Sequence, residues 1–166
     1  MIGTAKPQTA TTVLGLGEWD ATAEEGAVLS CLGLGSCVAF AARDPVAEVI
    51  GMAHMVLPDS TLGRGGGGKF VDTAIPLVLD KMKELGALRS RLTIYLVGGS
   101  QMLAKVTGDH GRIGERNAEV ARLTLASLRL PVKAEDLGGN RGRTVRLHRD
   151  GGEMTVSTAG EGAHVL

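Results

Sequence analysis

The sequence has few aromatic residues: one Trp, one Tyr and two Phe in 166 residues. Proteins that bind single-stranded nucleic acid stack the bases on aromatic side chains, and this chain offers few such platforms. An excess of charge is also missing, because 18 basic residues balance 18 acidic ones. No long-range field therefore draws the chain to phosphate backbones or anionic lipid. We expect no nucleic-acid partner and a core built from aliphatic side chains.

Cysteine and long hydrophobic runs are scarce as well. Only Cys31 and Cys37 are present, too few for a disulfide framework, which favours a reducing compartment. Residues 1–12 contain no apolar run of the roughly 7 to 15 residues that a signal peptide requires. No later run reaches the roughly 18 apolar residues of a membrane span. We therefore expect a cytoplasmic protein without direct membrane insertion.

The length of the chain is that of one ordinary domain, with no room for a second catalytic domain. Residues 1–12 are small and polar, and we expect them to form a flexible N-terminus. We expect a single domain over residues 13–160 and a C-terminal tail over residues 161–166.

The hydrophobic pattern predicts two helices among about eight strands. The first helix begins at Lys69, or near Ile75 if Pro76 prevents an earlier start, and ends at Gly86. The second covers residues 113–130 and stops before Pro131. Strands are predicted over residues 13–19, 27–32, 37–42, 49–57, 92–97, 132–135, 143–148 and 154–158, with a loop over 20–26. Turns at Asp44-Pro45 and Asp150-Gly151-Gly152 pair several of them, which favours an α+β fold of mixed α/β layers.

The segment Leu32-Gly33-Leu34-Gly35-Ser36-Cys37 places a thiol directly after a glycine-containing loop. The backbone N–H groups of Ser36 and Cys37 are candidate donors for an oxyanion hole. A nucleophilic thiol also needs a base, and His54 is the candidate, 54 − 37 = 17 residues further on. A turn at Asp44-Pro45 would bring the strand of His54 back beside Cys37.

A purely structural interpretation of these residues stays open. Cysteine is among the most buried residue types, and a buried cysteine is usually inert. A histidine in an apolar strand is commonly satisfied by a backbone carbonyl. His110, His148 and His164 lie in a loop, at a strand end and in the tail, and we interpret them as surface residues.

Residues 63–69 offer a competing function, because they match the G-x-x-x-x-G-K pattern of nucleotide-binding loops between a strand and a helix. Phe70, however, stands where that motif has a Ser or Thr for magnesium. The sequence therefore favours a flexible glycine loop that borders the active site over a nucleotide-binding protein.

Two further hypotheses concern the cysteines. A metal site made of Cys31, Cys37 and His54 lacks an evident fourth ligand, so we expect no metal and no organic cofactor. A reversible disulfide between Cys31 and Cys37 under oxidation is also conceivable, provided that the two Cα atoms come within about 7 Å.

Six motifs in order along the chain resemble those of one known family. They are Leu-Gly-Leu-Gly-Ser-Cys at 32–37, Asp44-Pro45, residues 51–60 with Gly-Met-Ala-His and Leu-Pro-Asp-Ser, Lys-Phe-Val-Asp at 69–72, Gly98-Gly99 with Ile-Gly-Glu-Arg-Asn at 113–117, and residues 134–141. In these motifs the chain resembles CheD, the family of chemoreceptor glutamine deamidases.

The resemblance implies a cysteine-dependent protein-glutamine glutaminase in which Cys37 is the nucleophile and His54 the base. It implies a fold related to the catalytic domain of the cytotoxic necrotizing factor toxins. The implied substrates are glutamines of methyl-accepting chemoreceptor helices, converted to glutamate through a thioester, in chemotaxis adaptation. A CheC-type phosphatase is the implied regulator, and we expect a monomer when the protein is free. A non-enzymatic binding module for CheC or receptors is the alternative.

One position departs from the family. A Thr that orients the histidine usually lies six residues before the nucleophile, and here that position is 37 − 6 = 31, which is Cys31. A thiol is a weaker hydrogen-bonding group than a hydroxyl. Either Cys31 is the third member of the site, or a backbone carbonyl orients His54 instead, as the related toxins imply.

Overall fold

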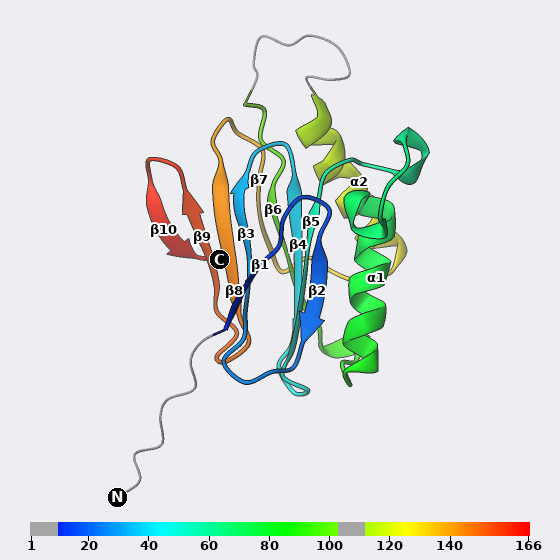
Figure 1. Ribbon diagram of the computed structural model, residues 1–166, viewed down its shortest axis with the longest axis vertical. Helices are drawn as coiled ribbons and strands as arrows, with labels where there is room; N and C mark the ends of the chain where they lie inside the picture. Colours follow the sequence, from blue (N-terminus) through cyan, green and yellow to red (C-terminus); the bar gives the residue numbers. More distant parts are fainter. Residues whose placement is uncertain (1–9, 103–111) are drawn as a thin grey trace, which may run out of the picture.

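The computed structural model describes residues 10–102 and 112–166. The first sheet has the strand order β1-β3-β8-β9-β10 and the second the order β2-β5-β4-β6-β7 (Figure 1). The strands of the first sheet are β1 (Thr11–Val13), β3 (Val28–Leu34), β8 (Arg143–His148), β9 (Met154–Thr158) and β10 (Gly162–Val165). Those of the second are β2 (Trp19–Thr22), β5 (Val49–Met55), β4 (Val38–Asp44), β6 (Thr93–Gly98) and β7 (Ala134–Leu137). The helices of the described residues are α1 (Val71–Glu84) and α2 (Ile113–Ser127), and short 3-10 turns are η1 (Ser60–Leu62), η2 (Gly67–Lys69) and η3 (Arg89–Arg91).

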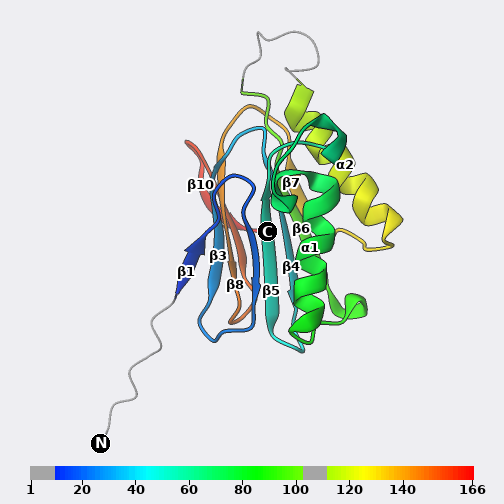
Figure 2. The ribbon, with the colours of Figure 1, turned by 45° about the vertical axis from the view of Figure 1, so that its right-hand side comes forward.

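The two sheets pack face to face, and both helices cover the outer face of the second sheet (Figures 1 and 2). Strand β4 lies in the middle layer and is buried on both faces. Phe40 packs with the helices, while Ala39 and Ala41 pack against the first sheet. A strand covered on both faces needs apolar residues at every position, which explains its continuous apolar run. The α+β layered fold predicted from the sequence is confirmed.

The hairpin predicted around Asp44-Pro45 is also confirmed. Strands β4 and β5 are antiparallel over their whole length, with Ala39 opposite His54 and Asp44 opposite Val49. The hairpin is completed on its two sides by β6 beside β4 and β2 beside β5. This pairing determines which side chains of the two strands share a face.

The strand predicted over residues 13–19 is wrong. The chain instead forms β1, then a turn, then β2, which includes part of the loop predicted over 20–26. Strand β2 is an edge strand in which only Ala21 is buried, so it lacks the apolar run on which the prediction relied. Residues 11 and 12, predicted to be flexible, belong to β1, and residues 1–9 lie outside the described part of the chain.

The C-terminal tail predicted over residues 161–166 is a strand for most of its length. Gly162–Val165 forms β10, antiparallel to β9 at the edge of the first sheet. All four of its residues are exposed. Backbone hydrogen bonds rather than apolar burial hold this strand, so the sequence carries no hydrophobic signal for it.

Both helices differ from prediction at one end. Helix α1 begins at Val71 and includes Pro76, which removes the backbone donor to the carbonyl of Asp72. Packing of its apolar face, which includes Ile75 and Val78, outweighs that loss. Helix α2 ends at Ser127 rather than at residue 130, because Arg129 adopts a left-handed conformation with φ of 56°.

Candidate active site

The register of the β4–β5 hairpin brings Cys37 and His54 to one face. His54 is directly opposite Ala39, and Cys37 lies two residues before Ala39, directly before the first residue of β4. Side chains two residues apart on a strand share a face, and such diagonal neighbours on adjacent strands are within side-chain reach. Both residues therefore face the layer between the two sheets, where Cys37 is 9% and His54 4% exposed.

A backbone carbonyl holds the imidazole of His54. Its Nδ1 lies 3.0 Å from the carbonyl oxygen of Leu14, in the turn between β1 and β2. A carbonyl can only accept, so Nδ1 carries the proton and Nε2 is left as the basic nitrogen. Nε2 is buried and has no hydrogen-bond partner within the described residues. The same turn also pairs with the backbone of His54, since Gly17 N–H donates to the His54 carbonyl at 2.9 Å.

Sequence reasoning did not identify Leu14. Its contribution is a main-chain oxygen that every residue possesses, so its side chain gives no signal. Only the pairing of β2 with β5, and the turn that precedes β2, bring this oxygen to His54.

The thiol of Cys37 lies in an apolar environment. Burial raises its pKa above the ordinary value, and a hydrogen bond from its own backbone N–H opposes the rise. Burial disfavours the thiolate because the charged form loses its hydration. At neutral pH the isolated thiol is therefore protonated, so it depends on a neighbouring base to become a nucleophile.

Cys31 lies in β3, in the same layer as Cys37. Burial first, and then the nearby charge of Cys37, raise the pKa of the Cys31 thiol to about 12. No hydrogen bond joins Cys31 to His54 in the part of the chain that the structure describes, and both cysteines are free thiols. Cys31 is thus a neutral side chain packed in the core.

The loop before β4 is held by its carbonyl groups. Strand β3 has an irregular register between Cys31 and Leu34, which redirects the chain into this loop. Within the described residues, the N–H groups of Ser36 and Cys37 donate no hydrogen bond to another residue. The three successive carbonyls, by contrast, all accept: Gly35 from Ser100 N–H at 2.8 Å, Ser36 from Asn117 Nδ2 at 2.9 Å, and Cys37 from Gly99 N–H at 2.8 Å.

Gly98, at the end of β6, packs against the carbonyl of Cys37. Its φ is +119°, and a Cβ placed on it would lie 2.2 Å from that carbonyl oxygen. Only glycine fits at such a close approach. The Gly98-Gly99 motif therefore positions the backbone of Cys37.

The glycine-rich segment over residues 63–69 has a different arrangement from a phosphate loop. Lys69 Nζ donates to the carbonyl of Arg64 at 3.2 Å, within its own segment. Phe70 is 3% exposed and faces the core, and α1 begins after it at Val71. The segment thus uses its lysine to hold itself together.

The two other histidines within the described residues lie away from the layer of Cys37. His164 is exposed on β10, His148 is half-buried at the end of β8, and His110 lies outside the described residues. No cluster of three or more His, Cys, Asp or Glu side chains arranged to hold a metal ion occurs in residues 10–102 and 112–166.

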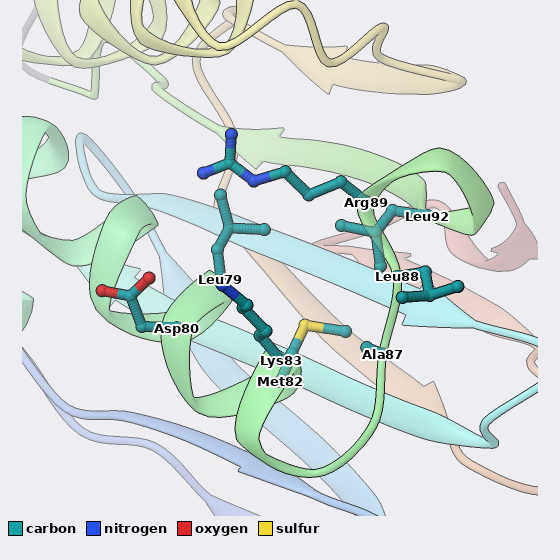
Figure 3. Close-up of a pocket in the computed structure, with 8 residues that line it drawn as sticks. All are labelled: Leu79, Asp80, Met82, Lys83, Ala87, Leu88, Arg89 and Leu92. Carbon is teal, nitrogen blue, oxygen red and sulfur yellow. The ribbon is translucent and has the colours of Figure 1, made fainter.

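A pocket at the other end of the domain is separate from this site. It lies between the C-terminal half of α1 and the segment that leads into β6, lined by apolar side chains such as Leu79, Met82 and Leu92 (Figure 3). Its Leu88 donates a backbone hydrogen bond to Asp44, the last residue of β4. Cys37 precedes the first residue of that strand, so the length of β4 separates the pocket from the thiol.

Among the described residues, no helix is long and apolar enough to span a membrane. The arrangement is that of a two-sheet protein with helices on one side and with the buried side chains of Cys37 and His54 on one face between the sheets.

Comparison with known proteins identifies the family. A model of the family described as CheD chemotactic sensory transduction matches residues 56–158. A probable chemoreceptor glutamine deamidase CheD of Symbiobacterium thermophilum is 42% identical, covering 92% of this chain and 95% of the relative. The chemoreceptor glutamine deamidase CheD of Thermotoga maritima is 39% identical, over 90% of this chain and 93% of the relative. This chain belongs to the CheD family.

Proposed function

We propose that the protein is a chemoreceptor glutamine deamidase in which Cys37 is the nucleophile and His54 the general base. The two relatives named above carry the names probable chemoreceptor glutamine deamidase and chemoreceptor glutamine deamidase, and the similarity covers nearly their whole length. The observation that carries the proposal is the orientation of His54: its Nδ1 is paired with the Leu14 carbonyl, and its Nε2, which has no partner within the described residues, lies on the face shared with Cys37.

The reaction begins with proton transfer from the Cys37 thiol to Nε2 of His54, as Sγ attacks the amide carbon of the glutamine side chain. The raised pKa of Cys37 supports transfer during the attack rather than a thiolate formed in advance. The negative charge moves to the amide oxygen, where the N–H groups of Ser36 and Cys37 are the proposed donors. Loss of one such donor costs about 2.7 to 4 kcal/mol of barrier height in enzymes of this kind.

The tetrahedral intermediate collapses when the His54 imidazolium gives its proton to the amide nitrogen, which leaves as ammonia. The product is a thioester between Cys37 and the former glutamine side chain. His54 then takes a proton from water, whose oxygen attacks the thioester carbon, and Sγ leaves and regains the proton. Glutamate is released, and no step requires a metal or an organic cofactor.

The regulator, the location and the oligomeric state of the protein are also part of the proposal. A CheC-type phosphatase is the proposed regulator, and the proposed setting is the cytoplasm, where receptor signalling helices are accessible. The free protein is proposed to be a monomer.

The test is to incubate the protein with a chemoreceptor cytoplasmic fragment and to analyse the peptides of the fragment by mass spectrometry. Each conversion of Gln to Glu adds about one dalton to its peptide. Wild type should produce the gain, and Cys37→Ala and His54→Ala should not. Equal gains in all three proteins would refute the mechanism. Receptor binding without any gain in wild type would instead identify a non-enzymatic binding module.

A further inference from the structure

Asn117 is a buried polar side chain that contacts the segments carrying both proposed catalytic residues. It lies in α2, is fully buried, and its Nδ2 donates to the carbonyls of Ser36 and Val56, both at 2.9 Å. Ser36 directly precedes Cys37, and Val56 lies two residues after His54. One side-chain amide thus joins the loop of the nucleophile to the end of the strand of the base.

The bond to Ser36 also orients a donor of the proposed oxyanion hole. The carbonyl of Ser36 and the N–H of Cys37 belong to one planar trans peptide group and point in opposite directions. Because Asn117 holds the oxygen toward α2, the N–H of Cys37 points to the other side. Ser100 N–H does the same for the preceding peptide, whose oxygen belongs to Gly35 and whose N–H belongs to Ser36.

Only an amide suits the two carbonyls. They are acceptors, so the nitrogen of Asn117 must face them, and an NH2 group has two protons to donate. A serine hydroxyl has one proton and an aspartate has none when ionised. Oδ1 of Asn117 has no hydrogen-bond partner within the described residues. An unpaired buried acceptor weakens a fold, so stability alone does not account for this residue.

We infer that Asn117 is a positioning residue, which sets the direction of the Cys37 N–H and the placement of the Cys37 loop against the His54 strand. The inference rests on the proposed function for its effect on catalysis. If Asn117 positions these groups, it is necessary for turnover rather than for substrate binding. Misplacement of reacting groups by about 1 Å commonly costs about 100-fold in rate.

The experiment compares wild type with Asn117→Ala and a matched control, Ala121→Gly. Ala121 is also buried in α2, but it lies one helical turn further along, and Gly there weakens the helix without removing either bond to the loop. Receptor deamidation and the rate of Cys37 alkylation by iodoacetamide are measured on folded protein, at a temperature below the unfolding midpoint of every variant. Peptide mapping separates Cys37 from Cys31.

We expect Asn117→Ala to lower kcat about 100-fold with little change in KM, and to change the pH dependence of Cys37 alkylation. Ala121→Gly should keep both properties of wild type despite a lower Tm. If Asn117→Ala does not fold, Asn117→Ser replaces it, since a hydroxyl cannot donate to both carbonyls. Unchanged kcat or unchanged Cys37 alkylation in a folded Asn117 variant would overturn the inference.

The two readouts separate this inference from the proposed function. If wild type does not deamidate receptors, the proposed function fails, while alkylation still reports whether Asn117 positions Cys37. If wild type is active and the Asn117 variant is equally active, only the positioning role fails.

Discussion

The tautomer of His54 depends on the carbonyl of Leu14, 3.0 Å from Nδ1. With the proton fixed on Nδ1, the other nitrogen is the only one able to accept the Cys37 proton. Cys31, for which the resemblance implied an orienting role, makes no hydrogen bond to His54 within the described residues. Of the two possibilities raised by the sequence, the geometry favours the backbone carbonyl as the orienting partner.

At this scale we predict that Cys31→Ala keeps the deamidation rate within about twofold of wild type, because the group that orients His54 remains. Removal of the buried sulfur leaves a small cavity, so the free energy of unfolding should fall by about 1 kcal/mol. Receptor mass spectrometry measures the rate, and urea unfolding measures the stability.

Cys31→Thr is the matched variant, since it restores the residue usual in the family. We expect its rate to equal that of Cys31→Ala within the same twofold range. A large loss in Cys31→Ala that is recovered in Cys31→Thr would show instead that the side chain at position 31 orients the histidine.

Secondary-structure elements converge on the loop of Cys37. The backbone of Gly99 and Ser100, directly after β6, and the side chain of Asn117 in α2 hold the carbonyls of this loop, although both segments are far from it in sequence. The β4–β5 pairing supplies the histidine. The site is therefore a property of the junction between these elements rather than of any one of them.

We predict that Gly98→Ala impairs both folding and activity. The new Cβ would lie 2.2 Å from the Cys37 carbonyl oxygen, so the backbone of the nucleophile must move. The backbone conformation alone costs about 1 to 3 kcal/mol for a residue with a side chain. Deamidation by the folded variant should fall at least about tenfold, measured beside urea unfolding.

Gly63→Ala is the control for that substitution. Gly63 has an extended backbone, and no atom lies within 4 Å of the position of its Cβ. Its rate and stability should match wild type. Full activity in a Gly98→Ala variant would show that the Cys37 backbone tolerates displacement.

At the end of the domain opposite Cys37, the buried carboxylate of Asp44 links two segments that are far apart in the sequence. Burial tends to raise the pKa of Asp44, but hydrogen bonds from Arg91 and from the N–H groups of Leu88, Ala47 and Val46 outweigh it and hold the pKa well below the ordinary value. Arg91 Nη2 lies 2.7 Å from Asp44 Oδ2. This pair connects the β4–β5 turn to the segment that leads from α1 to β6.

The depressed pKa makes stability depend on pH in a defined direction. A carboxyl with a folded-state pKa below its unfolded value of about 3.9 contributes stability above that value and loses it as pH falls toward the folded-state pKa. We predict that Asp44→Asn lowers the free energy of unfolding by about 1.5 to 3 kcal/mol at neutral pH, because the hydrogen bonds from the partly exposed Arg91 lose their charged acceptor. The difference should shrink below about pH 4, as urea unfolding over a pH series will measure.

Arg89→Ala is the control, since Arg89 belongs to the same 3-10 turn but does not pair with Asp44. It should change stability little and leave the pH dependence of wild type. A constant gap between wild type and Asp44→Asn at all pH values would contradict the role of the Asp44 charge.

The sequence by itself determined the features that follow from local pattern. Apolar runs on both sides of Asp44-Pro45 indicated a hairpin covered on both faces, and the turn expected there would bring His54 back beside Cys37. The apolar faces of α1 and α2 indicated two helices beside the sheets. These features depend on side chains within one element or on one short turn, so the sequence displays them directly.

Tertiary structure decided the rest. The edge strands β2 and β10 are held by backbone hydrogen bonds to their neighbouring strands and bury few apolar side chains. The sequence therefore has no hydrophobic pattern that predicts them. The carbonyl of Leu14 and the two bonds of Asn117 depend on backbone oxygens, which every residue carries. A sequence shows which residues have distinctive side chains, but only the tertiary structure determines which backbone groups form hydrogen bonds with them.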